Sequence, residues 1–461
     1  MIAAMPTFRL HPLRLIAFAL LGSLIVLGGA ITAVVALWQP RSLEAMLPGE
    51  GTIALFSNVT REDLRAWSDR FPTVRSVPNF AGQLELGILD FGNGSHGWIL
   101  SSPVKDVPLP ETNGTFRGQN VLFSNPKAMD MMTQVPRLRA IAMFQELSRG
   151  MSPGASRVYL RTNEQEASAA LPAQLRPFIV ASGGLLLSRD GEAALIRVYG
   201  KPATIHGSAP VGVTAVSPAP DLTLALATPV QMFDRELARF PDTERAVRRG
   251  QLTTVINDLL GDEWSLQYDI LPLISQTSTF SWKAGTGSMP SFLLRSSTTN
   301  VAEMKKRLLA FHESFKTRLT GTIITRHTFD RGFTSAILGS DPAHVEDLRT
   351  SVNGWTVRET RQKNGGRVML SATRGREFIV SNRRGWLEDI VTGTRELPLP
   401  TVSGQFVAGG TLSPALFERW TADMRSEPGW MWIRSTVHAK EEVLWGADME
   451  GKTLTVSIRG A

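Results

Sequence analysis

The chain has 461 residues, of which 43% are hydrophobic and 20% charged, a balance that indicates a folded body and excludes a disordered one. It holds no cysteine, which excludes disulfides, thiolate metal sites and a thiol nucleophile. Its net charge of +7 comes from scattered side chains without a dense basic run, so we expect no nucleic-acid partner.

One uncharged apolar stretch, Leu15–Trp38, is long enough to cross a bilayer as a helix of about 36 Å. Arg9 and Arg14 precede it and no acidic residue does, which predicts a cytoplasmic tail at 1–14 and an exported remainder. The expected partner of this transmembrane helix is the lipid bilayer. A signal peptide that is cleaved before Leu37 stays open as the alternative.

The remainder of the chain is predicted to form two exported domains. Residues 39–50, with two prolines, are a predicted linker to a first α+β domain at 51–200. Residues 201–220 are rich in proline, alanine and glycine and predict a second linker. The second α+β domain covers 221–461 and ends in a strand–helix–hairpin unit.

The first domain is predicted from short apolar runs, which indicate strands, and from capped amphipathic runs, which indicate helices. The expected strands are 52–57, 83–91, 97–101, 120–125, 157–161, 178–188 and 193–199. The expected helices are one that Thr60 caps and that runs to about Phe71, one that begins at Pro126, and one at 138–148.

The second domain shows the same alternation. The expected strands are 222–227, 275–283, 291–296, 355–361 and 367–373, and the expected helices are 229–240, 242–260 and 300–319. After a further linker at 397–403, a strand–helix unit leads to a closing hairpin around Glu450-Gly451. Hairpins with dispersed helices and no regular βαβ rhythm predict an α+β fold of largely antiparallel sheets.

Internal similarity predicts a duplication. GTIALFSNVTREDLRAWSDRFP from Gly51, DLTLALATPVQMFDRELARFP from Asp221 and GQFVAGGTLSPALFERWTADM from Gly404 each run from an apolar strand through a Thr or Ser cap into a helix. VLFSNPKAMDMM from Val121 and FIVSNRRGWLEDI from Phe378 share a strand, a Ser-Asn pair and a helix. Chance similarity of strand–cap–helix units is the alternative.

Four features together carry a family resemblance. They are the anchor, Leu47-Pro48 before the first strand, the strand-then-helix units, and the late Ser-Asn strand Ile379–Asn382. In this order the chain resembles a family of membrane-anchored bacterial exported proteins that is grouped only as a domain of unknown function. The resemblance implies the topology, and it implies no activity, cofactor or catalytic residue.

Two short motifs match catalytic or cofactor patterns but not their context. Gly92–Gly97 fits G-x-G-x-x-G after a strand, but a strand follows it where a dinucleotide site needs a helix, so we interpret it as a hairpin loop. Ser124–Lys127 fits S-x-x-K without the partner motifs of acyl enzymes, so Ser124 and Asn125 are interpreted as a helix start.

The remaining polar and aromatic candidates are also better explained by structure. The histidines, none at metal-binding spacing, are His11, His96, His206, His312, His327, His344 and His438. The adjacent acidic pairs, whose carboxylates should face apart, are Glu346-Asp347, Glu388-Asp389 and Glu441-Glu442. Trp430 and Trp432 are expected on one face of a strand, either in core packing or as a platform that stacks sugars or lies at a membrane surface.

No residue is therefore assigned a catalytic, cofactor-binding or metal-binding role. We expect a non-enzymatic, single-pass membrane protein whose exported body, in the periplasm or at the cell surface, binds or scaffolds an envelope protein or wall polymer. Two alternatives stay open. One is an exported hydrolase that acts on wall polymer or peptide, and the other is an accessory subunit of a membrane complex.

Overall fold

The computed structural model describes residues 42–460 with internal gaps, and residues 1–41 and 461 lie outside the described part. The gaps are 79–81, 93, 102–112, 117–118, 153, 164–178, 192, 203–212, 228, 239, 261–264, 275, 286–289, 329–333, 364, 394–395, 401–403, 421–427 and 438–441. The predicted tail 1–14 and the predicted span Leu15–Trp38 thus lie outside it. Within the described ranges, no helix combines the length and the apolar character that a membrane crossing requires.

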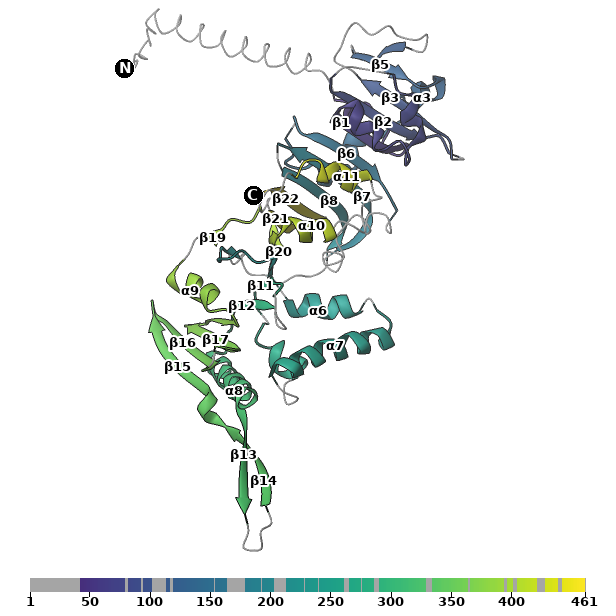
Figure 1. The fold of residues 1–461 in the computed structure, drawn as a ribbon. Coiled ribbons are helices and arrows are strands. Elements are labelled where there is room, and N and C mark those ends of the chain that lie inside the picture. Colours follow the sequence, from purple (N-terminus) through teal and green to yellow (C-terminus); the bar gives the residue numbers. More distant parts are fainter. Residues whose placement is uncertain are drawn as a thin grey trace, which may run out of the picture.

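Most strands belong to one antiparallel sheet of 18 strands (Figure 1). Its strands are β1 (Thr52–Val59), β2 (Leu84–Asp90), β3 (His96–Ser101), β4 (Asn113–Phe116), β5 (Gln119–Phe123), β6 (Ser156–Arg161), β7 (Ile179–Asp190), β8 (Ala193–Pro202), β10 (Leu222–Leu226), β11 (Ser278–Lys283), β12 (Ser291–Ser297), β15 (Val345–Val352), β16 (Trp355–Gln362), β17 (Val368–Arg374), β18 (Glu377–Ser381), β20 (Gln405–Leu412), β21 (Val443–Glu450) and β22 (Thr453–Gly460). Two small sheets pair β9 (Val213–Thr214) with β19 (Glu396–Leu397) and β13 (Gly321–Thr328) with β14 (Thr334–Asp341).

The described helices range from single short turns to the 19-residue helices α7 and α8. They are α2 (Arg61–Arg65), α3 (Pro126–Met131), α4 (Ala142–Ser148), α6 (Pro229–Ala238), α7 (Asp242–Leu260), α8 (Val301–Leu319), α9 (Arg384–Thr392), α10 (Pro414–Trp420) and α11 (Pro428–Arg434). Single turns add η1 (Leu43–Ala45), η2 (Pro72–Ser76), η3 (Leu138–Ala140), the π-helical turn η5 (Leu266–Ile270) and η6 (Pro342–His344). The prediction of an α+β fold with a largely antiparallel sheet is confirmed.

Side-chain caps explain where several helices begin. Thr60 and Asp63 form a reciprocal capping box at α2, with the Asp63 N–H donating to Thr60 Oγ1 at 3.2 Å. Asn125 Oδ1 accepts from Ala128 N at 2.9 Å, and Pro126 fills the first turn of α3. Asn300 caps α8 in the same way. These local signals were readable from the sequence, and the predicted helix starts at Thr60, Pro126 and Asn300 are confirmed.

Hydrogen-bonded neighbours give the order of strands across the sheet. From one edge to the other it is β4-β5-β3-β2-β1-β6-β7-β8-β22-β21-β20-β10-β11-β12-β18-β17-β16-β15. The same succession of pairings occurs on both sides of the β8–β22 contact. The strands β1, β2, β3, β5, β6, β7 and β8 hold the positions that β10, β11, β12, β18, β20, β21 and β22 hold on the other side.

The C-terminal strands β20–β22, which belong to the predicted second domain, lie in the middle of the sheet. β22 pairs with β8 of the first domain over Thr453–Arg459, and β20 pairs with β10 of the second over Ala408–Leu412 (Figure 1). The predicted domain boundary at 201–220 stays a prediction. The strands on both sides of this boundary nevertheless belong to one hydrogen-bonded sheet, because β8 pairs with β22. The predicted linker 39–50 also contains core residues, because Leu43, Met46 and Leu47 are fully buried.

The hydrophobic core follows this arrangement. The largest cluster joins β1, β2 and β6–β8 to the C-terminal unit through Trp67, Trp432 and Val456. A second cluster fills the other face of the first half beneath η1, α3 and α4. In the second half, α8 and α9 pack in separate clusters, with Phe311 in one and Trp386 in the other.

Several expectations require correction. The helix expected from Thr60 to Phe71 ends at Arg65, and turns carry the buried Trp67 and Phe71. The strand expected at Trp430 and Trp432 is wrong, because both lie in helix α11, where Trp432 is buried. The sequence reasoning also missed the hairpin β13–β14 and the strand β15.

Candidate functional site

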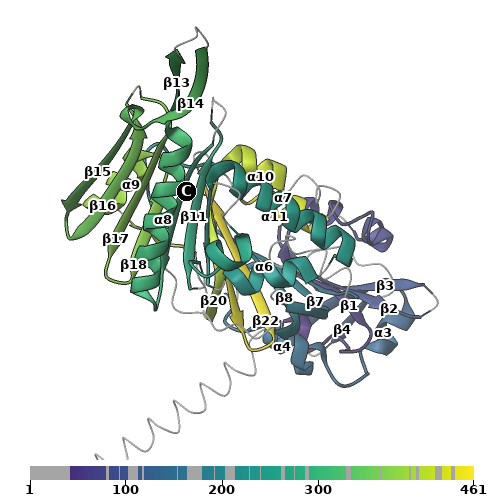
Figure 2. The same cartoon turned by 90° about the horizontal axis from the view of Figure 1, so that it is seen from below.

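The second half carries two elaborations that the described first half lacks. Between β10 and β11 the chain forms α6, α7 and η5, whereas the described residues of the corresponding β1–β2 connection form only α2 and η2. Between β12 and β17 it forms α8 and β13–β16. Figure 1 and Figure 2 show α6 and α7 side by side beside the sheet, and Figure 1 shows β13–β14 extending beyond it. We therefore look for a functional site in these two elaborations, which distinguish the second half from the first.

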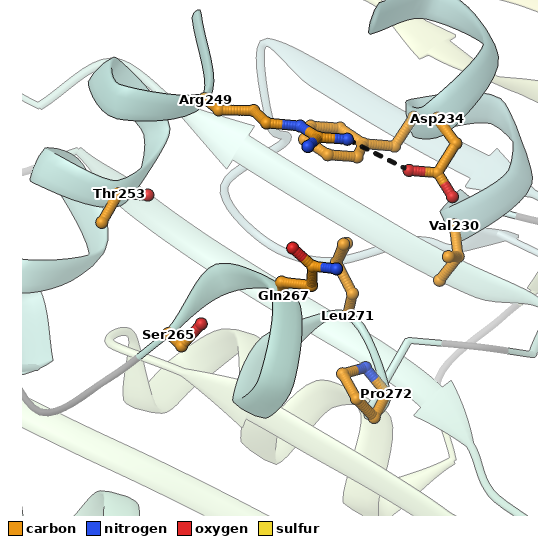
Figure 3. Close-up of a pocket in the computed structure, with 9 residues that line it drawn as sticks. Val230, Asp234, Arg249, Thr253, Ser265, Gln267, Leu271 and Pro272 are labelled. Atoms are coloured by element: carbon orange, nitrogen blue, oxygen red, sulfur yellow. Dashed lines mark ion pairs between the residues drawn. The ribbon is translucent and has the colours of Figure 1, made fainter. Parts of the chain in front are cut away.

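The helical elaboration forms a half-open pocket of about 390 Å³ (Figure 3). This volume lies within the usual range for small-molecule sites, roughly 300–1,000 Å³. Val230, Phe233 and Asp234 of α6 line it together with residues of α7 and of the segment 265–272. The described lining combines apolar side chains with several polar ones, and in ligand sites the polar groups fix the orientation of the ligand.

The polar side of the pocket centres on an ion pair. Arg249 of α7 reaches toward Asp234 of α6, with 4.0 Å between Nη2 and Oδ1, and Gln267 lies near them (Figure 3). This separation is too long for a direct hydrogen bond. The guanidinium N–H groups and the carboxylate oxygens can therefore both serve a ligand. Thr253 and Ser265 also line the pocket.

The neighbouring arginine on α7 is used differently. Arg248 donates to Glu244 Oε1 through Nη2 at 2.8 Å and stacks over the Phe240 ring at 3.8 Å. It does not line the pocket. Two adjacent arginines of α7 therefore have different surroundings. Arg249 lines the pocket, whereas Arg248 contacts Glu244 and Phe240.

The segment below the pocket is fixed by the second elaboration. Arg307 of α8 donates to the Tyr268 carbonyl at 2.6 Å and to Asp269 Oδ1 at 3.0 Å. Asp269 Oδ2 in turn accepts from Ser265 N at 2.9 Å. The lining residues 265–272 are thus held in place by α8, which is the preorganisation that a binding site needs.

A second polar cluster lies inside the protein, between α8 and the sheet. His312 is fully buried, with Nδ1 at 2.9 Å from Thr360 Oγ1 and Nε2 at 2.7 Å from Ser371 Oγ. In the neutral ring, one nitrogen donates to a hydroxyl and the other accepts from one. Burial, followed by the Arg358 charge, lowers the pKa of His312 to about 4.

The Ser371 hydroxyl and the His312 imidazole are the groups that serve elsewhere as a nucleophile and its base. Here they lack the accessible site that a reaction with a substrate requires. Ser371 is buried along with His312, and no described pocket includes either residue. The two hydrogen bonds instead join α8 to β16 and β17. The cluster is therefore a structural bridge, and the hydrolase alternative draws no support from it.

Charged side chains beside His312 form a chain of ion pairs. Arg358 Nη2 contacts Asp347 Oδ2 at 2.6 Å and Glu313 Oε1 at 2.6 Å. The hydrogen bond from Arg358 lowers the pKa of Asp347. Glu346, the neighbour of Asp347, pairs with Arg361 instead at 2.8 Å. The expectation that this acidic pair points apart is confirmed, and both carboxylates are occupied.

The two sequence motifs are found in structural roles. Gly92 and Gly94 have positive φ in the turn that joins β2 to β3, so the hairpin interpretation of Gly92–Gly97 is confirmed. Ser124 Oγ accepts from Trp98 N at 3.0 Å, whereas Lys127 Nζ donates to the Phe91 carbonyl at 3.0 Å. The serine and the lysine of the S-x-x-K motif thus hold separate backbone groups.

The other predicted candidates are dispersed. His344 is exposed and pairs with Asp341 at 2.5 Å, whereas His11, His206, His438 and Glu441 lie outside the described residues. Asp389 Oδ2 accepts from Ser217 N at 2.7 Å. Among the residues described, no cluster of three His, Asp or Glu side chains is arranged to hold a metal ion.

Sequence reasoning did not identify Asp234, Arg249 or Gln267. Their only sequence signal is the pair of consecutive helices at 229–260, which was predicted without a reason for its presence. A comparison of the chain with protein-family models, curated proteins and solved structures gives no match.

Proposed function

We propose that this chain is a membrane-anchored, extracytoplasmic binding protein that acts without catalysis. The observation that carries the proposal is the pocket among α6, α7 and the segment 265–272, with the Asp234–Arg249 pair beside an apolar surface. An ion pair with free donor and acceptor positions suits a ligand rich in amide and hydroxyl groups. Acetylated sugars and short peptides of a cell wall offer these groups.

The anchor in this proposal is the apolar stretch Leu15–Trp38. Its length and its basic N-terminal flank support a single span in a bacterial cytoplasmic membrane, with the folded body outside. The resemblance to anchored exported proteins of unknown function supports the same topology.

We propose as well that the two halves arose by duplication. The matching order of strand pairs around the β8–β22 contact supports this, as do the two Ser-Asn pairs. Ser124 binds the backbone of β3, and Ser381 Oγ donates to the Phe292 carbonyl of β12 at 2.8 Å. On this view the pocket is an addition to the second copy, while the shared sheet is the scaffold.

The test measures binding of soluble disaccharide-peptides, released from purified peptidoglycan, to the full chain in nanodiscs. We expect saturable binding that Arg249→Ala weakens about tenfold, because about 1.4 kcal/mol is a modest value for a charged hydrogen bond. Arg248→Ala is the matched control and should bind as the wild type does, since Arg248 contacts Glu244 and Phe240 instead.

The possible results separate the hypotheses. Equal binding by the two arginine variants would contradict the assignment of the pocket, and absence of saturable binding would contradict the proposed ligand class. Mass spectrometry of the recovered fragments should find them unchanged. Cleaved fragments would favour the exported hydrolase.

A further inference from the structure

One loop of the first half exposes an apolar side chain next to the start of the folded body. Val135, between α3 and η3, is 78% exposed, the largest fraction among the exposed large hydrophobic side chains of the described residues. Met129 of α3 is 49% exposed. A single exposed hydrophobic residue is ordinary on a protein surface. Whether Val135 contacts a partner therefore has to be judged from its position in the molecule.

The Val135 loop, residues 132–139, is attached to the first described segment of the chain. Leu138 N donates to the Leu47 carbonyl at 2.8 Å, and Gly49 N donates to the Pro136 carbonyl at 2.7 Å. Arg137 Nη1 donates to the Met46 carbonyl at 2.8 Å. Leu43, Met46 and Leu47 are themselves buried in the core. The loop and the segment 43–49 therefore form one fixed unit.

The chain length between the anchor and this unit is short. Only residues 39–42 separate Trp38, the last residue of the apolar stretch, from the buried Leu43. Fully extended, this connection spans at most about 17 Å. The end of the molecule that carries α3, opposite to β13–β14 (Figure 1), is thus held near any membrane in which Leu15–Trp38 is embedded.

The charges around Val135 are mixed. Lys127 and Arg139 are exposed here, and so are Asp130 and Glu50. Lys127 already donates to the Phe91 carbonyl, and Arg137 contributes its guanidinium to the Met46 carbonyl. Apolar side chains among charges of both signs match a zwitterionic headgroup layer better than a strongly anionic one.

We propose that the Val135 loop is a second membrane contact, in which Val135 and Met129 enter the headgroup region beside the anchor. The inference rests on the proposed membrane anchor and goes beyond it, because it sets the orientation of the body on the bilayer. The occupant of this surface is the zwitterionic lipid interface of the membrane that holds the chain.

The test uses the absence of native cysteine, which makes an introduced thiol unique. The full chain with Val135→Cys carries an environment-sensitive fluorophore in phosphatidylcholine nanodiscs with or without headgroup spin-labelled lipid. We expect a blue-shifted emission that the spin label quenches. Val247→Cys, on the 59% exposed Val247 of α7, is the matched control and should show neither effect. Met129→Cys provides a second reporter if the first variant folds poorly.

The outcomes distinguish the loop contact from the anchor. Alkaline carbonate extraction of the same variants from vesicles tests the anchor by itself. Resistance to extraction with an unquenched Val135 reporter overturns the loop contact and leaves the anchor. Release by carbonate overturns the proposed anchor and, with it, the inference. A blue shift that depends on protein concentration and not on lipid would indicate that a second copy of the chain covers the loop. This result would also overturn the inference.

Discussion

His312 shows how one buried side chain links stability to pH. Its imidazole lies between Thr360 and Ser371 without access to solvent, and burial lowers its pKa from 6.5 to about 4. Between these two values the unfolded chain binds a proton that the folded chain excludes. Unfolding is therefore favoured as the pH falls through this window, and the contribution of neutral His312 to folding is fully present above about pH 7.

We predict that His312→Gln reduces the pH dependence of folding. The wild-type chain should lose about 2–3 kcal/mol more unfolding free energy than the variant between pH 7.5 and pH 4.5, because one pKa unit represents about 1.4 kcal/mol. Urea unfolding of both proteins in the same detergent at the two pH values measures this difference. Equal losses of unfolding free energy in the wild type and the variant would show that His312 does not titrate as its burial requires.

Two glycines show how an element depends on the space around its backbone. A Cβ on Gly410 of β20 would lie 1.8 Å from the Thr223 carbonyl oxygen of β10, so the two strands could not keep their pairing. A Cβ on Gly250 of α7 meets no atom within 4 Å. A change from glycine to alanine therefore causes a collision at Gly410 in the strand and none at Gly250 in the helix.

We predict opposite effects of alanine at these positions. Gly410→Ala should destabilise the chain by about 2 kcal/mol or more because the sheet must open to admit it. Gly250→Ala should stabilise it by up to about 1 kcal/mol because glycine is a poor residue in a helix interior. Thermal unfolding of the two variants gives the comparison. A stabilised Gly410→Ala variant would mean that β20 and β10 are not adjacent.

At the scale of the whole molecule, the C-terminal hairpin connects the two halves. β22 pairs with β8 and, through β21 and β20, with β10. Trp432 Nε1 also donates to Asp63 Oδ1 at 3.0 Å, which fastens α11 to α2. The last part of the chain thus contributes to the core of the first, and the halves are expected to unfold together.

We predict that Val456→Asp, at a fully buried position of β22, removes protection from hydrogen exchange in β6–β8 and in β10–β12 alike. The reason is that an unpaired buried carboxylate costs several kcal/mol. Val352→Asp at the half-exposed end of edge strand β15 is the control and should leave both regions protected. Loss of protection confined to one side of the β8–β22 contact would contradict the coupling.

Local patterns in the sequence determined much of the fold by themselves. The caps at Thr60 and Asn125, the helix that begins at Asn300, the hairpin turn at Gly92–Gly97 and the helices at 229–260 were all predicted, since each depends on residues within a few positions of one another. The Leu15–Trp38 span and the duplication also come from the sequence and stay predictions.

Only the tertiary structure decided which distant groups meet. Many strands here are similar short apolar runs, so no local signal selects β8 as the partner of β22. Ser371 is 59 residues from His312, and Asp234 is separated from Arg249 by the end of one helix and the start of the next. Such contacts depend on how the whole chain closes around its core, because side-chain packing between elements, and not the preference of any single segment, sets their positions.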